Sequence, residues 1–297
     1  STPPSTTSAK PSVPTASLPG TGMLQKLLLA LLLLAPISQG ADFLFATRKL
    51  NIPQTKSSKA LDAVCGNHLL DFDITYLASN NEAINKTTNY HINKMLCDAF
   101  HPFEECDFGE QMMSDTVLEN TVEEVANNSL ATGLDSLNGG NKTCGYAAVS
   151  FEVKAVPQYF GHYHGLEQIM IDFSEYQGGA HEIPSLRHLL LTPDGKRLKY
   201  DDLFFPDSAE KLQPLLLEAW NNREEVKLGN GYPKDEESDF PQTDNLLFTA
   251  QGLMFHYRHY EIASFAEGDP QLVIPYEKLK GILKDKYLSL PNETAAP

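Results

Sequence analysis

Alternation of apolar and polar positions predicts several β-strands in the middle of the chain. In the segment 68–78, HLLDFDITYLA, four apolar side chains fall on one face at a period of two. Two longer segments of the same kind follow, AAVSFEVKAVPQYF and GLEQIMIDFSEY. Residues 161–165 between them contain two glycines, and they predict a wide turn between antiparallel partners. A further strand is expected at 186–191, before the turn sequence TPDGK.

Apolar residues at helical spacing predict helices on either side of these strands. The segments 83–100 and 112–130 have this pattern, and Ser208 is expected to cap a helix that contains the only tryptophan. The remaining expectations are three short strands and a last helix, at 246–249, 253–257, 271–274 and 276–284. Because the strands are grouped rather than separated by crossover helices, the fold class we predict is α+β, an antiparallel sheet with helices packed on it.

The first 40 residues have the pattern of an export signal. Residues 1–22 hold five Ser, five Thr and five Pro, so we expect a disordered leader, upstream of a true start at Met23. Residues 23–40 combine Lys26 with an apolar run and small residues, as signal peptides do. The expected location is therefore periplasmic or extracellular, with no stable membrane anchor after cleavage. The alternative is an uncleaved anchor, although the apolar run is about half of the ~20 residues that a membrane-spanning helix needs.

The charge of the chain disfavours nucleic acid as a partner. The net charge is −16, and removal of residues 1–40 would leave 21 basic and 39 acidic side chains, a net charge of −18. A surface of this kind repels nucleic acid and anionic lipid and attracts cationic partners. Acidity that serves solubility alone is the competing interpretation.

Four cysteines, all in the N-terminal half, predict two disulfide bonds. An even number of cysteines in an exported chain favours disulfides over free thiols or zinc. Three pairings are possible. We expect Cys97 to pair with Cys106, because that loop is short, and Cys65 to pair with Cys144.

Four separated segments resemble the bacterial domain of unknown function 3298, which includes the extracellular domain of the lysozyme-sensing anti-sigma factor RsiV. They are YQGGAH (176–181), TPDGKRLKYDDLF (192–204), LFTAQGLMFHYRHYEIASFAEG (247–268) and LVIPYEKLKGIL (272–283), in that order. Residues 68–175 more faintly resemble the companion domain of unknown function 4163. The resemblance implies two tightly associated halves, an N-terminal half with the disulfides at 41–175 and a 3298-like domain at 176–285, followed by a tail at 286–297.

The resemblance also implies a function. It points to an exported, non-enzymatic binding module, with a cell-wall glycan or a cationic protein such as lysozyme as its ligand. In place of the sigma-binding segment and membrane helix of the anti-sigma factor, the sequence shows the expected leader and signal peptide, so we do not expect it to regulate a sigma factor. We also do not expect the catalytic activity of the deacetylases that carry the companion region.

The segment YQGGAH is the first candidate for a ligand site. Adjacent glycines at positions 178 and 179 allow positive φ and a close backbone approach, which a bend between two strands requires. That structural role is one interpretation. The functional one is a polar cluster at one rim of the sheet, formed by these glycines and the side chains that flank them or lie near residue 260. The ligand-binding candidates are Tyr176, Gly178, Gly179, His181, Tyr260 and Glu261.

A secreted envelope hydrolase is the alternative function. His162 and His164 lie at i and i+2, and with His181 they are the histidines that a metal site would use. No HExxH motif and no GxSxG elbow are present, so no catalytic residue is assigned. We expect no cofactor and leave the question of enzymatic activity open.

Overall fold

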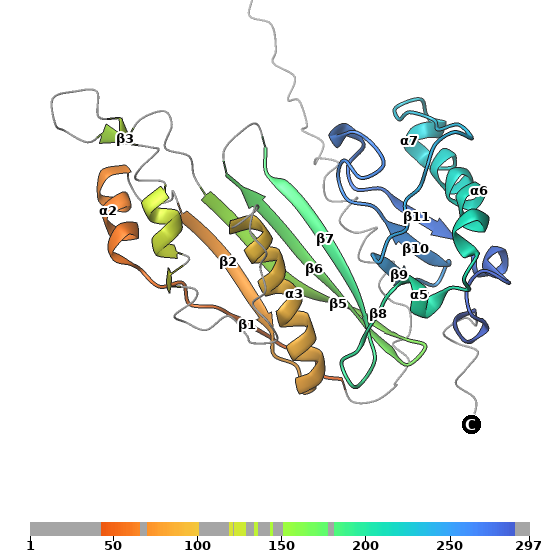
Figure 1. The fold of residues 1–297 in the computed structure, drawn as a ribbon, viewed down its shortest axis with the longest axis horizontal. Coiled ribbons are helices and arrows are strands. Elements are labelled where there is room, and N and C mark those ends of the chain that lie inside the picture. Colours follow the sequence, from red (N-terminus) through yellow and green to blue (C-terminus); the bar gives the residue numbers. More distant parts are fainter. Residues whose placement is uncertain are drawn as a thin grey trace, which may run out of the picture. The chain divides into compact units, whose positions relative to one another are not determined.

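The computed structural model places the strands predicted before residue 192 in one six-stranded sheet. It describes residues 43–65, 70–100, 119–120, 122–128, 134–135, 143–144, 151–177 and 181–288. The sheet has the order β1-β2-β5-β6-β7-β8 (Figure 1), with bounds Thr47–Lys49, Leu70–Leu77, Phe151–Tyr163, Leu166–Tyr176, Ile183–Leu191 and Arg197–Leu198. The α+β class is confirmed. All neighbouring strands are antiparallel except β2 and β5, which pair in parallel from Leu70↔Phe151 to Ile74↔Ala155. The sheet is therefore mixed, whereas the sequence predicted a purely antiparallel one.

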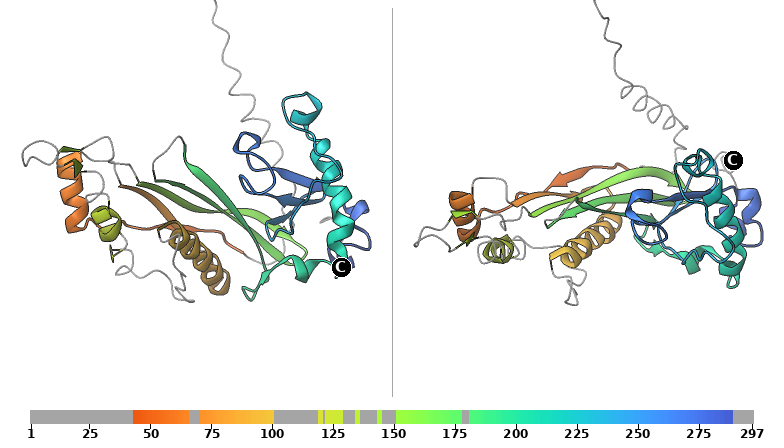
Figure 2. Two further views of the ribbon diagram at one scale, coloured as in Figure 1. Left: turned by 45° about the horizontal axis from the view of Figure 1, so that its top comes forward. Right: turned by 90° about the horizontal axis from the view of Figure 1, so that it is seen from above.

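Helix α3 (Glu82–Phe100) covers one face of this sheet (Figures 1 and 2). Odd-numbered positions of β6 and β7, among them Ile169, Ile171 and Leu189, are buried together with apolar residues of α3. The period of two that marked these strands in the sequence thus fixes which side chains face the helix. The long apolar helix predicted at 83–100 is confirmed within one residue.

The opposite face of β6 and β7 contacts the C-terminal part of the chain. Here a three-stranded antiparallel sheet, β11-β10-β9, shares a second core with α6, and Leu166 and Leu190 belong to this core. The bounds of these elements are β9 Leu246–Phe248, β10 Leu253–His256, β11 Gln271–Ile274, α5 Tyr200–Leu203, α6 Ser208–Asn221 and α7 Glu224–Lys227. The predicted boundary near residue 176 therefore falls between β6 and β7, which are hydrogen-bonded neighbours.

Two amide side chains join the two sheets, one fully buried and one half-buried. Gln168 on β6, fully buried, donates from Nε2 to the carbonyl of Phe248 at 3.1 Å and accepts from the Phe248 N–H at 2.7 Å. Asn245 makes a similar pair of hydrogen bonds with β7. Its Oδ1 accepts from the His188 N–H, and its Nδ2 donates to the Leu186 carbonyl. Each amide takes the place that a neighbouring peptide group would have in a ladder.

Three local predictions are wrong. The turn between β5 and β6 is a tight one of two residues, His164 and Gly165, both with positive φ as a type I′ turn requires, and Gly161 instead sits at a bulge within β5. Ser208 is the first residue of α6, and the N-cap is Asp207, whose side chain accepts no capping hydrogen bond. In place of a helix at 276–284 there are two short 3-10 segments, Tyr276–Leu279 and Asp285–Tyr287.

The N-terminal half also contains α2 (Lys56–Cys65), a helical stretch at 119–120 and 122–128, and the short strands β3 (Leu134–Asp135) and β4 (Thr143–Cys144). Cys65 and Cys97 each take part in a disulfide bond, and no pair is formed within the part of the chain that the structure describes in full. The side chains of Cys106 and Cys144 lie outside the described residues, so both predicted pairings stay predictions.

The expected leader and signal peptide (1–40) and the tail beyond residue 288 lie outside the described residues. Within the part of the chain that the structure describes, no helix is long and apolar enough to cross a membrane.

We predict that Gln168→Ala lowers the free energy of unfolding by about 2 to 4 kcal/mol, because it leaves the buried N–H and C=O of Phe248 without partners. Urea denaturation measures the change. The matched control is Gln213→Ala, since Gln213 makes the same two bonds to the backbone of Phe240 at a half-buried position, where water can replace them. Equal losses of unfolding free energy for the two variants would contradict the role that we assign to the buried hydrogen bonds between the two sheets.

Candidate functional site

A basic cleft lies where β7 and β8 meet α3 and two C-terminal loops. Its volume is about 600 Å³, which lies in the range of small-molecule sites. We call it the basic cleft and define it by the five cationic side chains that line it. These are Lys94 of α3, Arg187 of β7, Arg197 of β8, Lys199 and Arg258. The acidic residues of its lining are Asp244 and Glu261, so cations predominate here although the chain as a whole carries a net charge of −16.

Arg187 and Arg197 carry the electrostatic character of the basic cleft. Both are half-buried, and in the described part of the chain neither has a carboxylate within ion-pair distance. The bond that Arg187 makes is a long one, 3.5 Å from Nη1 to Nδ1 of His91. Burial, followed by the positive charge of Arg197, lowers the pKa of Arg187 to about 10. Two neighbouring guanidinium groups that repel each other are a costly arrangement in the absence of an anion.

Arg197 has donors that the protein leaves unused. Its Nε atom is buried and has no hydrogen-bond partner among the described residues, while its Nη2 reaches the carbonyl of Asp244 at 3.5 Å. The carboxylate of Asp244 lies near enough to favour the charged form of Arg197, but its Oδ1 accepts the backbone N–H of Tyr200. Because guanidinium groups bind carboxylates and phosphates through paired donors, the open donors of Arg197 suit an anion.

His91 is neutral in this environment. It projects from α3 beside Arg187, and burial followed by the charges of Arg197, Arg187, Lys199 and Lys94 lowers its pKa to about 3. An uncharged imidazole next to four cations adds no further repulsion. An anion bound in the basic cleft would cancel part of the positive potential and so raise this pKa.

The turn at 192–196 positions β8 and Lys199. Gly195 has a φ of 81°, and an added Cβ would lie 2.6 Å from the backbone oxygen of Ala83, so the turn sits directly against the start of α3. The hydroxyl of Thr87 on α3 donates to the Gly195 carbonyl at 2.7 Å. The predicted TPDGK turn is thus confirmed, and it ties the strand that carries Arg197 to the helix that carries His91.

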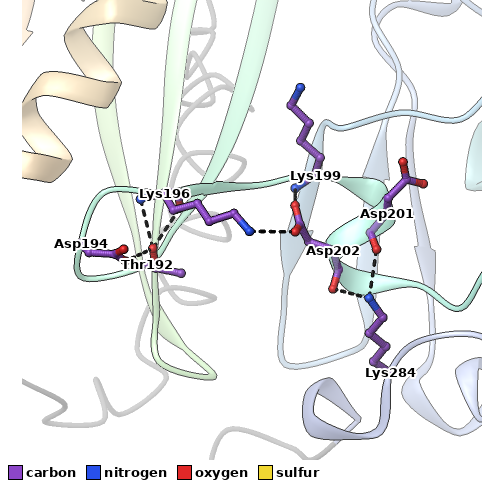
Figure 3. Close-up of polar contacts among 7 residues, drawn as sticks. All are labelled: Thr192, Asp194, Lys196, Lys199, Asp201, Asp202 and Lys284. Carbon is purple, nitrogen blue, oxygen red and sulfur yellow. Dashed lines mark hydrogen bonds and ion pairs between the residues drawn. The ribbon is translucent and has the colours of Figure 1, made fainter.

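A polar network then fixes the backbone of Lys199 and leaves its ammonium group pointing away (Figure 3). Asp202 accepts from the Lys199 N–H at 2.9 Å and from Lys196 Nζ at 3.0 Å. Lys284 donates to the carbonyls of Asp201 and Asp202. Both carboxylate oxygens of Asp202 are therefore occupied, and the side chain of Lys199 stays in the lining of the basic cleft.

Of the predicted rim residues, Glu261 lines this cleft, and two others, His181 and Tyr260, meet through an aromatic ring rather than through polar contacts. His181 stacks on Phe265 with a centroid separation of 3.7 Å, and Tyr260 contacts the same ring at 5.6 Å. Glu261 lines the basic cleft and accepts the N–H of Arg258. Tyr176 is the last residue of β6, and Gly178 and Gly179 lie outside the described residues.

The three histidines considered for a metal are not brought together. His162 lies opposite Glu167 in the β5–β6 pair and bonds its carboxylate at 2.9 Å, and His164 is at the tip of that hairpin against Phe248. His181 precedes β7 at the other end of the same strands. Among the described residues no group of three or more His, Cys, Asp or Glu could hold a metal ion.

Sequence reasoning missed a row of three hydrogen-bonded polar residues, of which the two histidines are buried. Asp269 accepts from His256 Nε2 at 2.9 Å, and His256 Nδ1 lies 2.8 Å from His188 Nε2. The arrangement is like the acid and base of a catalytic triad. However, His188 Nδ1 has no hydrogen-bond partner among the described residues, so none of them stands in the position of the nucleophile. Burial, followed by His256, lowers the pKa of His188 to about 3. We read this row as part of the seam between the sheets.

Comparisons with known proteins agree with the resemblance seen in the sequence. The sequence profile of a family described as "Protein of unknown function (DUF3298)" matches residues 201–277. A DUF3298 family protein from Pseudomonas aeruginosa PAO1 has a similar structure, with a TM-score of 0.50, 16% identity, and coverage of 83% of this chain and 94% of that one. A member of the family from Bacteroides fragilis NCTC 9343 gives a TM-score of 0.54, 21% identity, and coverage of 82% and 94%.

These likenesses show a shared fold. No curated protein matches the sequence. The expected match of residues 68–175 to the companion domain stays a prediction.

We predict that acid destabilises the protein partly through His91. Its folded-state pKa of about 3 lies below the unfolded value of about 6.5, so between these pH values the imidazole is protonated in the unfolded chain and neutral in the folded chain. The free energy of unfolding should therefore fall between pH 6.5 and 3, by up to about 1.4 kcal/mol per pH unit for this group. In His91→Asn the fall should be shallower, as measured by urea denaturation from pH 7 to 4. The same pH dependence in both proteins would contradict the assignment.

Proposed function

We propose that this chain, which carries a DUF3298 domain at residues 201–277, is a non-enzymatic binding module that takes an anionic ligand into the basic cleft. The observation that carries the proposal is the pair Arg187 and Arg197, two half-buried guanidinium groups without a carboxylate partner in the described residues. Unpaired charges of this kind lower stability, and they are typical of sites that are completed by a ligand.

The chemistry of the lining favours binding over catalysis. The cations would hold an acid group, but the described residues around them offer no nucleophile with an adjacent base and no metal cluster. His91, the one histidine of the lining, is a poor general base because its pKa of about 3 is far below neutrality. A secreted envelope hydrolase therefore has less support from this site than a binding module has.

The export signal expected at 23–40 would bring the protein to the periplasm or the cell surface, where acidic wall glycans are available ligands. A glycan with carboxylate or phosphate groups matches the basic cleft. A cationic protein such as lysozyme is the second candidate, and it rests on a different observation, the net charge of −16. A cationic protein would be repelled by the basic cleft and would need another surface.

We predict that inorganic phosphate binds in the basic cleft and that Arg187→Met combined with Arg197→Met weakens this binding at least tenfold, because it removes the paired donors. Isothermal titration calorimetry measures the affinity. The control is Arg48→Met, an exposed arginine on β1 at the opposite edge of the sheet, which should bind like the wild type. As a second readout, phosphate should raise the pKa of His91 in a chemical-shift titration.

The double variant is expected to fold, because it removes two charges that repel each other and replaces them with side chains of similar length. Its free energy of unfolding without ligand should equal or exceed that of the wild type. If the folded double variant bound phosphate with the affinity of the wild type, the proposal would be contradicted.

A pull-down with lysozyme addresses the second candidate. Lysozyme captured equally by the wild type and by the double variant would favour the cationic protein and an interface outside the basic cleft. Absence of capture by either protein would remove that candidate and leave the anionic ligand.

A further inference from the structure

Four aromatic side chains form a platform beside the basic cleft. We call them the aromatic platform and define it as His181, His259, Tyr260 and Phe265. Phe265 is the centre, since His181 stacks on it at 3.7 Å with an interplanar angle of 18°, His259 lies at 4.8 Å and Tyr260 at 5.6 Å. These rings come from two parts of the chain that are distant in sequence. One is the segment just before β7, and the other contains the turn 258–261 and the 3-10 segment Phe265–Glu267 that closely follows it.

Tyr260 has two properties that packing alone does not explain. Its side chain is 63% exposed, and its φ is +65°, a left-handed conformation that is unfavourable for a bulky residue. His164 is the one other non-glycine with positive φ among the described residues, and the tight hairpin there requires it. Backbone strain of this kind is concentrated at ligand sites. In the turn 258–261 the strained residue exposes the ring of Tyr260 to solvent.

The turn that carries Tyr260 connects the aromatic platform with the edge of the basic cleft, although the four platform residues are not themselves in its lining. Arg258 and Glu261, the first and last residues of the turn that carries Tyr260, both line the basic cleft. On the other side, β7 begins two residues after His181, and it carries Leu186 and Arg187 into the lining. A ligand held by the guanidinium groups can therefore extend over the turn and onto exposed rings.

We infer that the ligand of the basic cleft is an anion with a six-membered or larger ring system close to its acid group, and that one face of the ring packs on the aromatic platform. The inference rests on the proposed function, since the acid group must first occupy the basic cleft. Two sources supply this chemistry. One is an acidic sugar, whose apolar C–H face packs on aromatic rings, and the other is a nucleotide, whose base stacks on them.

The experiment compares each ring-bearing anion with its simple parent by calorimetry. N-acetylmuramic acid is set against acetate, and adenosine monophosphate against inorganic phosphate. We expect at least one ring-bearing member to bind about tenfold more tightly than its parent, the lower part of the range for stacking on one aromatic side chain. The pair that shows the gain identifies the sugar or the base as the source.

The variant Tyr260→Gly tests the position of the ring. Glycine removes the ring and adopts positive φ without strain, so the fold should be retained. The gain should fall to about threefold or less, while the affinity for the parent anion stays unchanged. Tyr232→Gly is the control, because Tyr232 is 75% exposed on a loop that does not line the basic cleft, and it should keep the full gain.

The outcomes separate the two proposals. If the parent anions bind and neither ring adds affinity, or if Tyr260→Gly keeps the gain, the inference is overturned and the binding function stands. If no anion of either kind binds, the proposed function has failed and the inference falls with it.

Discussion

The rest of the structure depends on a polar seam buried between two sheets. Gln168 on β6 hydrogen-bonds the N–H and the C=O of Phe248 on β9. Asn245 hydrogen-bonds the His188 N–H and the Leu186 C=O on β7. Apolar packing tolerates small shifts, but a buried amide satisfies its donor and its acceptor in one register alone. The seam therefore fixes the C-terminal sheet relative to the six-stranded sheet, and the basic cleft lies at the edge of this junction. Asn245 belongs to both, because it bonds β7 and lines the basic cleft.

This constraint explains how like charges can be held together without a partner. Arg187 is on a strand of the six-stranded sheet, and Arg197 is on a strand that the turn 192–196 ties to α3. Neither backbone can move to relieve the repulsion without breaking buried hydrogen bonds, so the stability of the seam offsets the electrostatic cost of the basic cleft. A neutral His91 beside Arg187 adds no further charge to this repulsion. For the anion that we propose, donors held in place in this way would reduce the entropy lost on binding.

The sequence predicted the parts of this molecule that depend on periodicity. The face of β6 that packs on α3 and the length of α3 itself follow from apolar spacing, and the TPDGK turn follows from residue types. The basic cleft could not be found in this way. Its arginines stand at positions 187 and 197, in segments of ordinary strand pattern, and only the pairing of β7 with β8 brings them together. Phe265 was missed for the same reason, since nothing in its neighbourhood shows that the ring of His181 covers it.

The difference between the local and the total charge has a consequence for recognition. A chain with a net charge of −16 repels anions at long range, so diffusion is not steered toward the basic cleft, and the association rate gains nothing from electrostatics. Attraction begins only within about one Debye length, roughly 8 Å at physiological ionic strength, where the half-buried guanidinium groups are poorly screened. Salt weakens the long-range repulsion more than this short-range attraction. Under the proposed function, an anion would therefore be selected by what fits inside the basic cleft and beside it, rather than by charge at a distance, and a ring next to the acid group is the kind of feature on which such selection would depend.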